Sequence, residues 1–203
     1  MEEMNDIGIL TFQRTTNYGA ALQAFALQEA IKKLGYRVNI IDYKCTEVEA
    51  RELYTFPRPS KNVIQWLRAC KGYFCKRKKR KIINEFINSY NLSERQYTKK
   101  TVTQIGNSYK KCIVGSDMVW DINITKGDYT FFLDFATQSK NSYAASLNVK
   151  SMRGNERKAI SLLRNFKNIS VRECDAQFFL DNNGIKSEVV LDPTLLLTGD
   201  FWR

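Results

Sequence analysis

A polar turn between an apolar strand and a long helix, within residues 11–43, constrains the fold of this chain most. The strand is expected at residues 7–12, and apolar residues at helical spacing predict a helix from about Asn17 to Leu34. Asn17 is a good N-cap, and Gly35 can adopt the left-handed conformation that ends a helix. A second strand is expected at residues 37–43. The sequence therefore predicts a strand, helix, strand unit of the kind that builds α/β proteins.

The turn itself, residues 13–20, has the features of an anion-binding site. Free backbone N–H groups and the positive end of the helix dipole favour negative charge there, and Gly19 lets a ligand approach the backbone closely. Arg14 adds a full positive charge. The alternative is structural, with Asn17 only capping and Gly19 only packing, because one glycine is a weaker signal than a full G-x-G-x-x-G pattern.

Strands and helices alternate along the rest of the chain. Helices are expected at residues 101–108, 153–166 and 173–182, and strands at residues 111–115, 141–146, 168–172 and 187–191. This pattern predicts an α/β fold with a Rossmann-like, mostly parallel sheet and helices on both faces. Ligands of such folds bind beyond the carboxyl ends of the strands. Polar residues follow these ends at Arg14, Asn17, Ser116, Asp117, Ser146, Arg172 and Glu173.

Two of these residues have clear chemical roles open to them. Asp117 can act as a base toward a hydroxyl if its surroundings raise its pKa, and the planar guanidinium of Arg172 can hold a carboxylate or phosphate. The structural alternatives are that Asp117 caps the following turn and that Arg172 pairs with neighbouring carboxylates. Trp120 is expected in the core, and Asp192 before Pro193 is expected to shape a turn.

Composition excludes several classes of site. The 203 residues contain no histidine, so Ser-His-Asp and Cys-His arrangements and histidine metal sites cannot be built from this chain. The five cysteines are scattered, so neither a disulfide framework nor a metal site is predicted. No apolar run approaches the roughly 20 residues that cross a bilayer, and the acidic start does not resemble a signal peptide. A cytoplasmic protein is expected.

Positive charge is concentrated in the middle of the chain. Residues 61–111 carry 14 basic and 2 acidic side chains, and the whole chain has a formal charge of +11. Residues 76–81 form a run of six, followed by apolar residues at helical spacing. This helix is either a solvated surface element or a surface that attracts an anionic glycan or the inner membrane face. No specific nucleic-acid partner is expected, because no zinc-finger, RRM or helix-turn-helix pattern accompanies the charge.

Several motifs occur in a fixed order. They are NYGAALQ at residues 17–23, CIVGSDMVWD at 112–121, FFLDFA at 131–136, SYAAS at 142–146, ISVRE at 169–173 and VLDPT at 190–194. In this order they resemble the polysaccharide pyruvyl transferase family, over nearly the whole chain except about residues 45–81. Two positions differ from the family's pattern. Met118 stands where the family usually has a polar residue, and Asp121 stands where Asn is common.

The resemblance implies a fold and an activity. The fold would be the N-terminal half of a two-domain, GT-B-like transferase, with residues 1–203 as a single α/β domain carrying a variable basic helical insertion at about 45–100. The activity would be transfer of a pyruvyl ketal group from phosphoenolpyruvate to a sugar hydroxyl in cell-surface polysaccharide biosynthesis, without a further cofactor. Asp117 would be catalytic, and the substrate contacts would be Arg14, Asn17, Tyr18, Gly19, Gly115, Ser116, Ser146, Arg172 and Glu173.

The catalytic acid is expected in a second, C-terminal domain, so residues 1–203 alone are expected to bind a donor or an acceptor weakly without turnover. The enzyme would be cytoplasmic, or peripheral at the inner membrane face. Two other classes stay open. One is half of a nucleotide-sugar glycosyltransferase, and the other is a non-catalytic module that binds an anionic glycan or a membrane surface.

Overall fold

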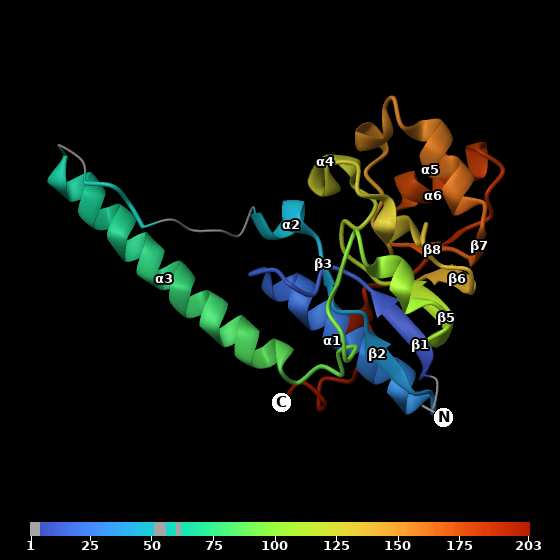
Figure 1. The fold of residues 1–203 in the computed structure, drawn as a ribbon, viewed down its shortest axis with the longest axis horizontal. Helices are drawn as coiled ribbons and strands as arrows, with labels where there is room; N and C mark the ends of the chain where they lie inside the picture. Colours follow the sequence, from blue (N-terminus) through green and yellow to red (C-terminus); the bar gives the residue numbers. More distant parts are fainter. Residues whose placement is uncertain (1–4, 51–55, 60–61) are drawn as a thin grey trace.

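A five-stranded sheet forms the centre of the molecule (Figure 1). The structure is a computed structural model that describes residues 5–50, 56–59 and 62–203. In spatial order the strands are β2 (Val38–Ile40), β1 (Asn5–Leu10), β5 (Tyr109–Val114), β6 (Ser139–Ser142) and β7 (Phe166–Asn168). Every neighbouring pair is parallel. The predicted Rossmann-like α/β fold is confirmed.

The sheet buries a core on each face because side chains alternate along its strands. On one face, Ile7 and Ile9 of β1 pack with apolar residues of helix α1 (Tyr18–Lys33). On the other face, Leu10 joins the larger core. That core contains Trp120, which is fully buried, as expected from the sequence. Gly8 leaves room for an aromatic ring, since a Cβ there would lie 2.9 Å from the side chain of Tyr109.

Both ends of α1 lie where the sequence places them. The Asn17 side chain caps the helix by accepting a hydrogen bond from the Gly19 N–H at 2.8 Å. After the helix, Gly35 adopts a φ of +85° and donates its N–H to the Lys32 carbonyl at 2.8 Å. Both ends of the helix are thus set by local signals.

Two predicted strands are each divided in the structure. Residues 37–43 give β2 and then β3 (Tyr43–Lys44), which pairs with β4 (Tyr97–Thr98). At this division the Gln13 side-chain amide donates to the carbonyls of Ile41 and Tyr43, both at 3.3 Å. Residues 168–172 give the end of β7 and then β8 (Ser170–Val171), which pairs with β9 (Glu188–Val189).

The remaining helices are short, with one exception. They are α2 (Thr46–Ala50), α4 (Ile122–Thr125), α5 (Glu156–Leu163), α6 (Cys174–Asn182) and the 3₁₀ turns η1 (Val102–Ile105), η2 (Tyr129–Phe132), η3 (Val149–Met152) and η4 (Pro193–Leu196). The helix predicted at 101–108 is therefore only η1, which ends at Gly106 with a φ of +49°. The helix predicted at 153–166 begins only after Gly154, which has a φ of +80°.

The exception is α3 (Val63–Ile87), a helix of 25 residues that projects from the α/β body (Figure 1). Its C-terminal end is anchored, because Ile83 and Ile87 are buried and the Phe86 ring lies 5.2 Å from the Phe25 ring of α1. Both α2 and α3 fall in the stretch where the basic helical insertion is expected. Within the described residues, no helix is long and apolar enough to cross a membrane.

Candidate functional site

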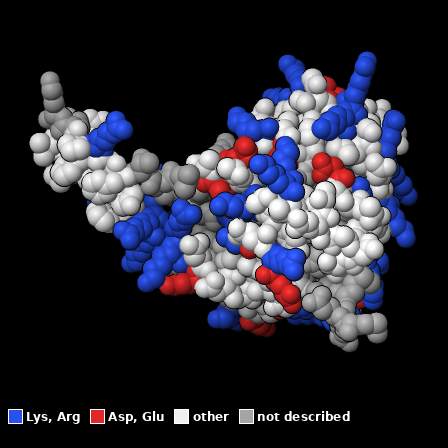
Figure 2. All heavy atoms as spheres, viewed as in Figure 1, with Lys and Arg blue, Asp and Glu red and all other residues white. Residues whose placement is uncertain are grey.

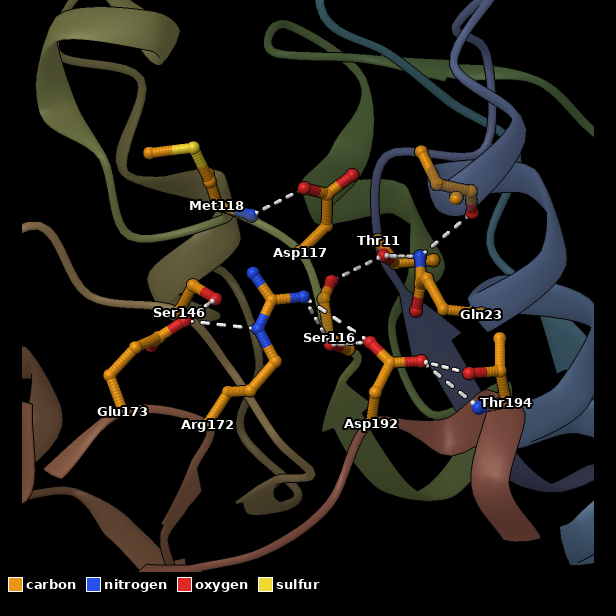
Figure 3. A network of polar contacts seen from close by, with 12 residues as sticks. Thr11, Gln23, Ser116, Asp117, Met118, Ser146, Arg172, Glu173, Asp192 and Thr194 are labelled. Atoms are coloured by element: carbon orange, nitrogen blue, oxygen red, sulfur yellow. Dashed lines mark hydrogen bonds and ion pairs between the residues drawn. The ribbon is translucent and has the colours of Figure 1, made fainter.

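The carboxyl ends of the central strands bring polar side chains from four segments together (Figure 3). Beyond β5 and β6, isolated bridges link Asp117 to Ala145 and Ala145 to Val171, so the chain after each strand continues the parallel alignment. The Ser146 N–H also donates to the Asp117 carbonyl at 3.0 Å. Ser116, Asp117, Ser146, Arg172 and Glu173, all predicted site residues, therefore lie at one edge of the sheet.

Arg172 is the centre of this edge. Its Nε donates to Glu173 Oε1 at 3.0 Å, and its Nη1 donates to Asp192 Oδ2 at 3.2 Å and to Ser116 Oγ at 3.4 Å. Burial works against the charge of the guanidinium, but these two carboxylates raise the pKa of Arg172. Arg172 is therefore a fixed cation with its planar group held from two sides.

Asp192 supports Arg172 and is itself held by hydrogen-bond donors. Its Oδ1 accepts from the N–H and the hydroxyl of Thr194, at 3.0 and 2.8 Å, and its Oδ2 accepts from Ser116 Oγ at 3.1 Å. Burial alone would raise the pKa of Asp192, but these donors and Arg172 lower it below its usual value. The residue is therefore ionised, and it orients the guanidinium as well as the turn that the sequence predicted.

Asp117 has the opposite electrostatic character. Burial raises the pKa of its carboxyl, and the nearby charge of Asp192 acts in the same direction. A hydrogen bond from the Met118 N–H at 2.8 Å and the charge of Arg172 oppose the shift without cancelling it. The backbone of Asp117 has a φ of +81°, which is uncommon outside glycine but which Asp and Asn adopt more often than other residues. A partly desolvated carboxylate with a raised pKa is a typical candidate for a base.

Two hydrogen-bond acceptors at this edge are left open. Among the described residues, no donor reaches Gln23 Oε1 or Glu173 Oε2, although both atoms are buried. The other atoms of these groups are fixed, because Gln23 Nε2 donates to Thr11 Oγ1 at 2.9 Å and Ser146 Oγ donates to Glu173 Oε1 at 2.6 Å. Buried acceptors without donors are rare in folded proteins, so these two oxygens are suited to accept from ordered water at this edge.

The opening turn contributes to a different place. The Arg14 guanidinium donates to both oxygens of Asp42, at 2.5 and 2.6 Å, and these bonds raise the pKa of Arg14. Arg14 lines a cavity of about 300 Å³ with Arg80 and Asn84 of α3. The sequence led us to expect a free cation, whereas the structure shows one that is bound to an internal carboxylate.

The other predicted substrate contacts, at residues 17–19 and 115, have structural roles. The N–H of Gly19 is used by the Asn17 cap, and the Tyr18 ring lies 4.5 Å from Lys79 Nζ. At Gly115, an added Cβ would lie 3.0 Å from Thr11 Cβ and 3.3 Å from the Leu27 side chain. Gly115 therefore allows β5 and α1 to pack closely, which brings Thr11 and Gln23 next to Ser116.

Sequence reasoning missed Thr11, Gln23 and the second role of Asp192. Gln23 carried a usable signal, because it lies on the same face of α1 as the buried Ala20 and Leu27, where a polar residue is unusual. Asp192 also follows a predicted strand end, but the sequence does not show that it pairs with Arg172, 20 residues earlier.

The family model for polysaccharide pyruvyl transferase matches residues 17–203. No curated protein and no solved structure matches the chain. The Arg172 network consists of Arg172 and the residues labelled around it in Figure 3, and the matched span contains all of them except Thr11. With nearly the whole chain matched, the protein belongs to the polysaccharide pyruvyl transferase family.

Proposed function

We propose that this chain provides part of an active site that transfers a pyruvyl group from phosphoenolpyruvate to a saccharide as a ketal. In the balanced reaction, two sugar hydroxyls form bonds to C2 of the donor, C3 gains a proton to become a methyl group, and the bond from C2 to the phosphate oxygen breaks. The observation that carries the proposal is the position of Asp117, whose carboxyl has a pKa raised by burial, at the same edge of the sheet as the fixed cation Arg172.

Asp117 is the proposed base for the attacking hydroxyl. A general base works best when its pKa lies closer to the working pH, and burial moves the carboxyl of Asp117 in that direction. Its Oδ1 is held by the Met118 N–H, so the carboxylate has a defined orientation at the end of β5. We propose that Asp117 takes the hydroxyl proton as the bond to C2 forms.

Arg172 is the proposed contact for a negative group of the donor. Its Nε and Nη1 are occupied, but no described residue accepts a hydrogen bond from Nη2, which points into the space between Arg172 and the segment of Asp117 and Met118 in Figure 3. This nitrogen can donate to a carboxylate or phosphate oxygen. A donor held there would lie between the cation and the base.

The sugar is proposed to bind at the part of this site that solvent reaches, next to Glu173. The Glu173 side chain is 36% exposed and lies beside Arg172 (Figure 3), and its carboxylate can accept hydrogen bonds from hydroxyl groups. This edge is therefore proposed as the acceptor side of a cleft between two domains, as in GT-B-like transferases.

The remaining substrate contacts predicted from the sequence are part of the same proposal. Arg14, Asn17, Tyr18 and Gly19 would bind substrate only in a complex in which the cavity beside α3 is part of the cleft. No cofactor besides the donor is proposed, and the reaction is placed in the cytoplasm, near the inner membrane face. The acid that protonates C3 is proposed to come from a second domain. Asp192 has a lowered pKa and so carries no proton to donate, and the raised pKa of Arg172 makes its guanidinium a poor proton donor.

Residues 1–203 alone are therefore expected to bind ligands without turning them over. The test incubates the purified chain with phosphoenolpyruvate and a panel of hexosides with free hydroxyl pairs, and follows phosphate release and the ketal methyl signal by NMR. We expect neither product. Ketal formation would confirm the reaction but contradict the division of base and acid between domains.

A further inference from the structure

The N-terminal half of α3 has an apolar face that lies in solvent. Leu67 and Phe74 are 54% and 56% exposed, and Val63 and Ile64 are exposed as well. This half of the helix projects beyond the α/β body in Figure 1. Exposed apolar residues that are grouped on one element indicate an interaction surface.

The exposed face lies on the opposite side of the helix from the one that anchors it. At about 3.6 residues per turn, Val63, Leu67 and Phe74 share one side of α3, whereas Ile83 and Ile87 share the other. The second pair is buried against the body. Because the apolar stripe changes sides along the helix, α3 can stay docked by its C-terminal end and present its N-terminal half outward.

The basic residues of α3 are also divided between the side that faces the body and the exposed side. The helix contains eight basic residues and one acidic residue, Glu85. Lys79 and Arg80 face the body, at the Tyr18 ring and at the Arg14 cavity. By helical spacing, Arg77 and Lys78 continue the side of Leu67 and Phe74. Figure 2 shows the resulting group of basic side chains between the apolar end of α3 and the body.

We propose that α3 docks the protein on an anionic lipid surface. The apolar stripe at Val63, Leu67 and Phe74 would enter the headgroup region, and Arg77 and Lys78 would bind lipid phosphates. Helices with an apolar stripe next to basic residues lie in the plane of such interfaces. A soluble polyanion would form ion pairs with Arg77 and Lys78 but would leave the apolar stripe exposed to water. This inference does not depend on the transfer chemistry at the strand ends.

The test measures co-sedimentation of the chain with phosphatidylcholine vesicles that contain or lack phosphatidylglycerol. We expect binding only to the anionic vesicles, with weaker binding at high salt. The double variant Leu67→Ser/Phe74→Ser is expected to lose at least about tenfold in affinity. Arg77→Gln/Lys78→Gln is expected to lose about tenfold.

A matched control separates this surface from general hydrophobicity. Leu34 directly after α1 and Phe178 in α6 are 73% and 70% exposed on the body, and Leu34→Ser/Phe178→Ser is expected to bind like the parent. Trp66 gives a readout without disruption of the apolar stripe, because it lies in α3 and is only partly buried. Its fluorescence should shift to shorter wavelength on anionic vesicles, and the Trp66→Phe variant should lack that shift.

Three results would overturn the proposal. They are equal binding to neutral vesicles, unchanged binding of Leu67→Ser/Phe74→Ser, and a Trp66 emission that stays constant on anionic vesicles. Binding to dextran sulfate as tight as to vesicles, with no effect of the Leu67 and Phe74 changes, would also assign the surface to a soluble polyanion instead.

Discussion

Replacement of Arg172 by Ala is expected to reduce the affinity of the chain for phosphoenolpyruvate by about 10- to 100-fold, the range for one lost hydrogen bond to a charged group. The variant also leaves Glu173 and Asp192 without their shared cation, next to the partly desolvated Asp117. Because about a third of the Arg172 side chain is reached by solvent, the expected loss of stability is about 1–2 kcal/mol. Isothermal titration with the donor and urea denaturation measure the two effects.

Two further variants separate binding from folding. Arg172→Lys keeps the charge but cannot reach Glu173, Ser116 and Asp192 with a planar group, so an intermediate loss of affinity is expected. Arg164→Ala removes an exposed arginine whose Nη2 contacts the Asn183 carbonyl at 3.3 Å, and it should bind the donor like the parent. If Arg172→Ala binds phosphoenolpyruvate with unchanged affinity, Arg172 does not contact the donor.

Asp117→Asn is expected to separate catalysis from stability. Asn keeps an oxygen for the Met118 N–H and tolerates the positive φ, so the fold is retained. Removal of a negative charge beside Arg172 should leave donor affinity unchanged or higher. In a preparation that forms the ketal, loss of the base should lower the rate by about 100- to 10,000-fold. Asp117→Ala, which loses the hydrogen bond and fits this φ poorly, should be about 1–2 kcal/mol less stable than Asp117→Asn.

The pH dependence of stability follows from the raised pKa of Asp117. The folded state binds the Asp117 proton more tightly than the unfolded state, whose carboxyl has a pKa near 3.8. The stabilising contribution is therefore present at pH below that value and is lost as pH rises through the folded pKa. Asn does not titrate, so the stability of Asp117→Asn relative to the parent should increase over the same range. A difference that stays constant with pH would show that Asp117 is not perturbed by burial.

Residues whose partners are close in sequence were predictable. The ends of α1 are set by Asn17 and Gly35, and both act within one turn of the helix. The meeting of Ser116, Ser146 and Arg172 followed from a general rule, because the carboxyl ends of parallel strands share one edge of a sheet.

Residues whose roles depend on distant partners could not be predicted from the sequence. Arg14 is bound by Asp42, 28 positions later, and Arg172 by Asp192, 20 positions later. In both cases one partner lies at or beside a predicted strand that the structure divides into two. The outward face of α3 was missed for a related reason. The basic run predicted a helix, but the structure shows that the helix begins at Val63, with its apolar stripe changing sides.

The most direct test of the account compares ligands on the unmodified chain. Thermal unfolding of residues 1–203 is measured with phosphoenolpyruvate and, separately, with a panel of nucleotide sugars, since a ligand that binds the folded state raises Tm. We predict that phosphoenolpyruvate raises Tm in the parent but not in Arg172→Ala, and that nucleotide sugars have no effect. Stabilisation by a nucleotide sugar, without any by phosphoenolpyruvate, would contradict the account and indicate a glycosyltransferase site.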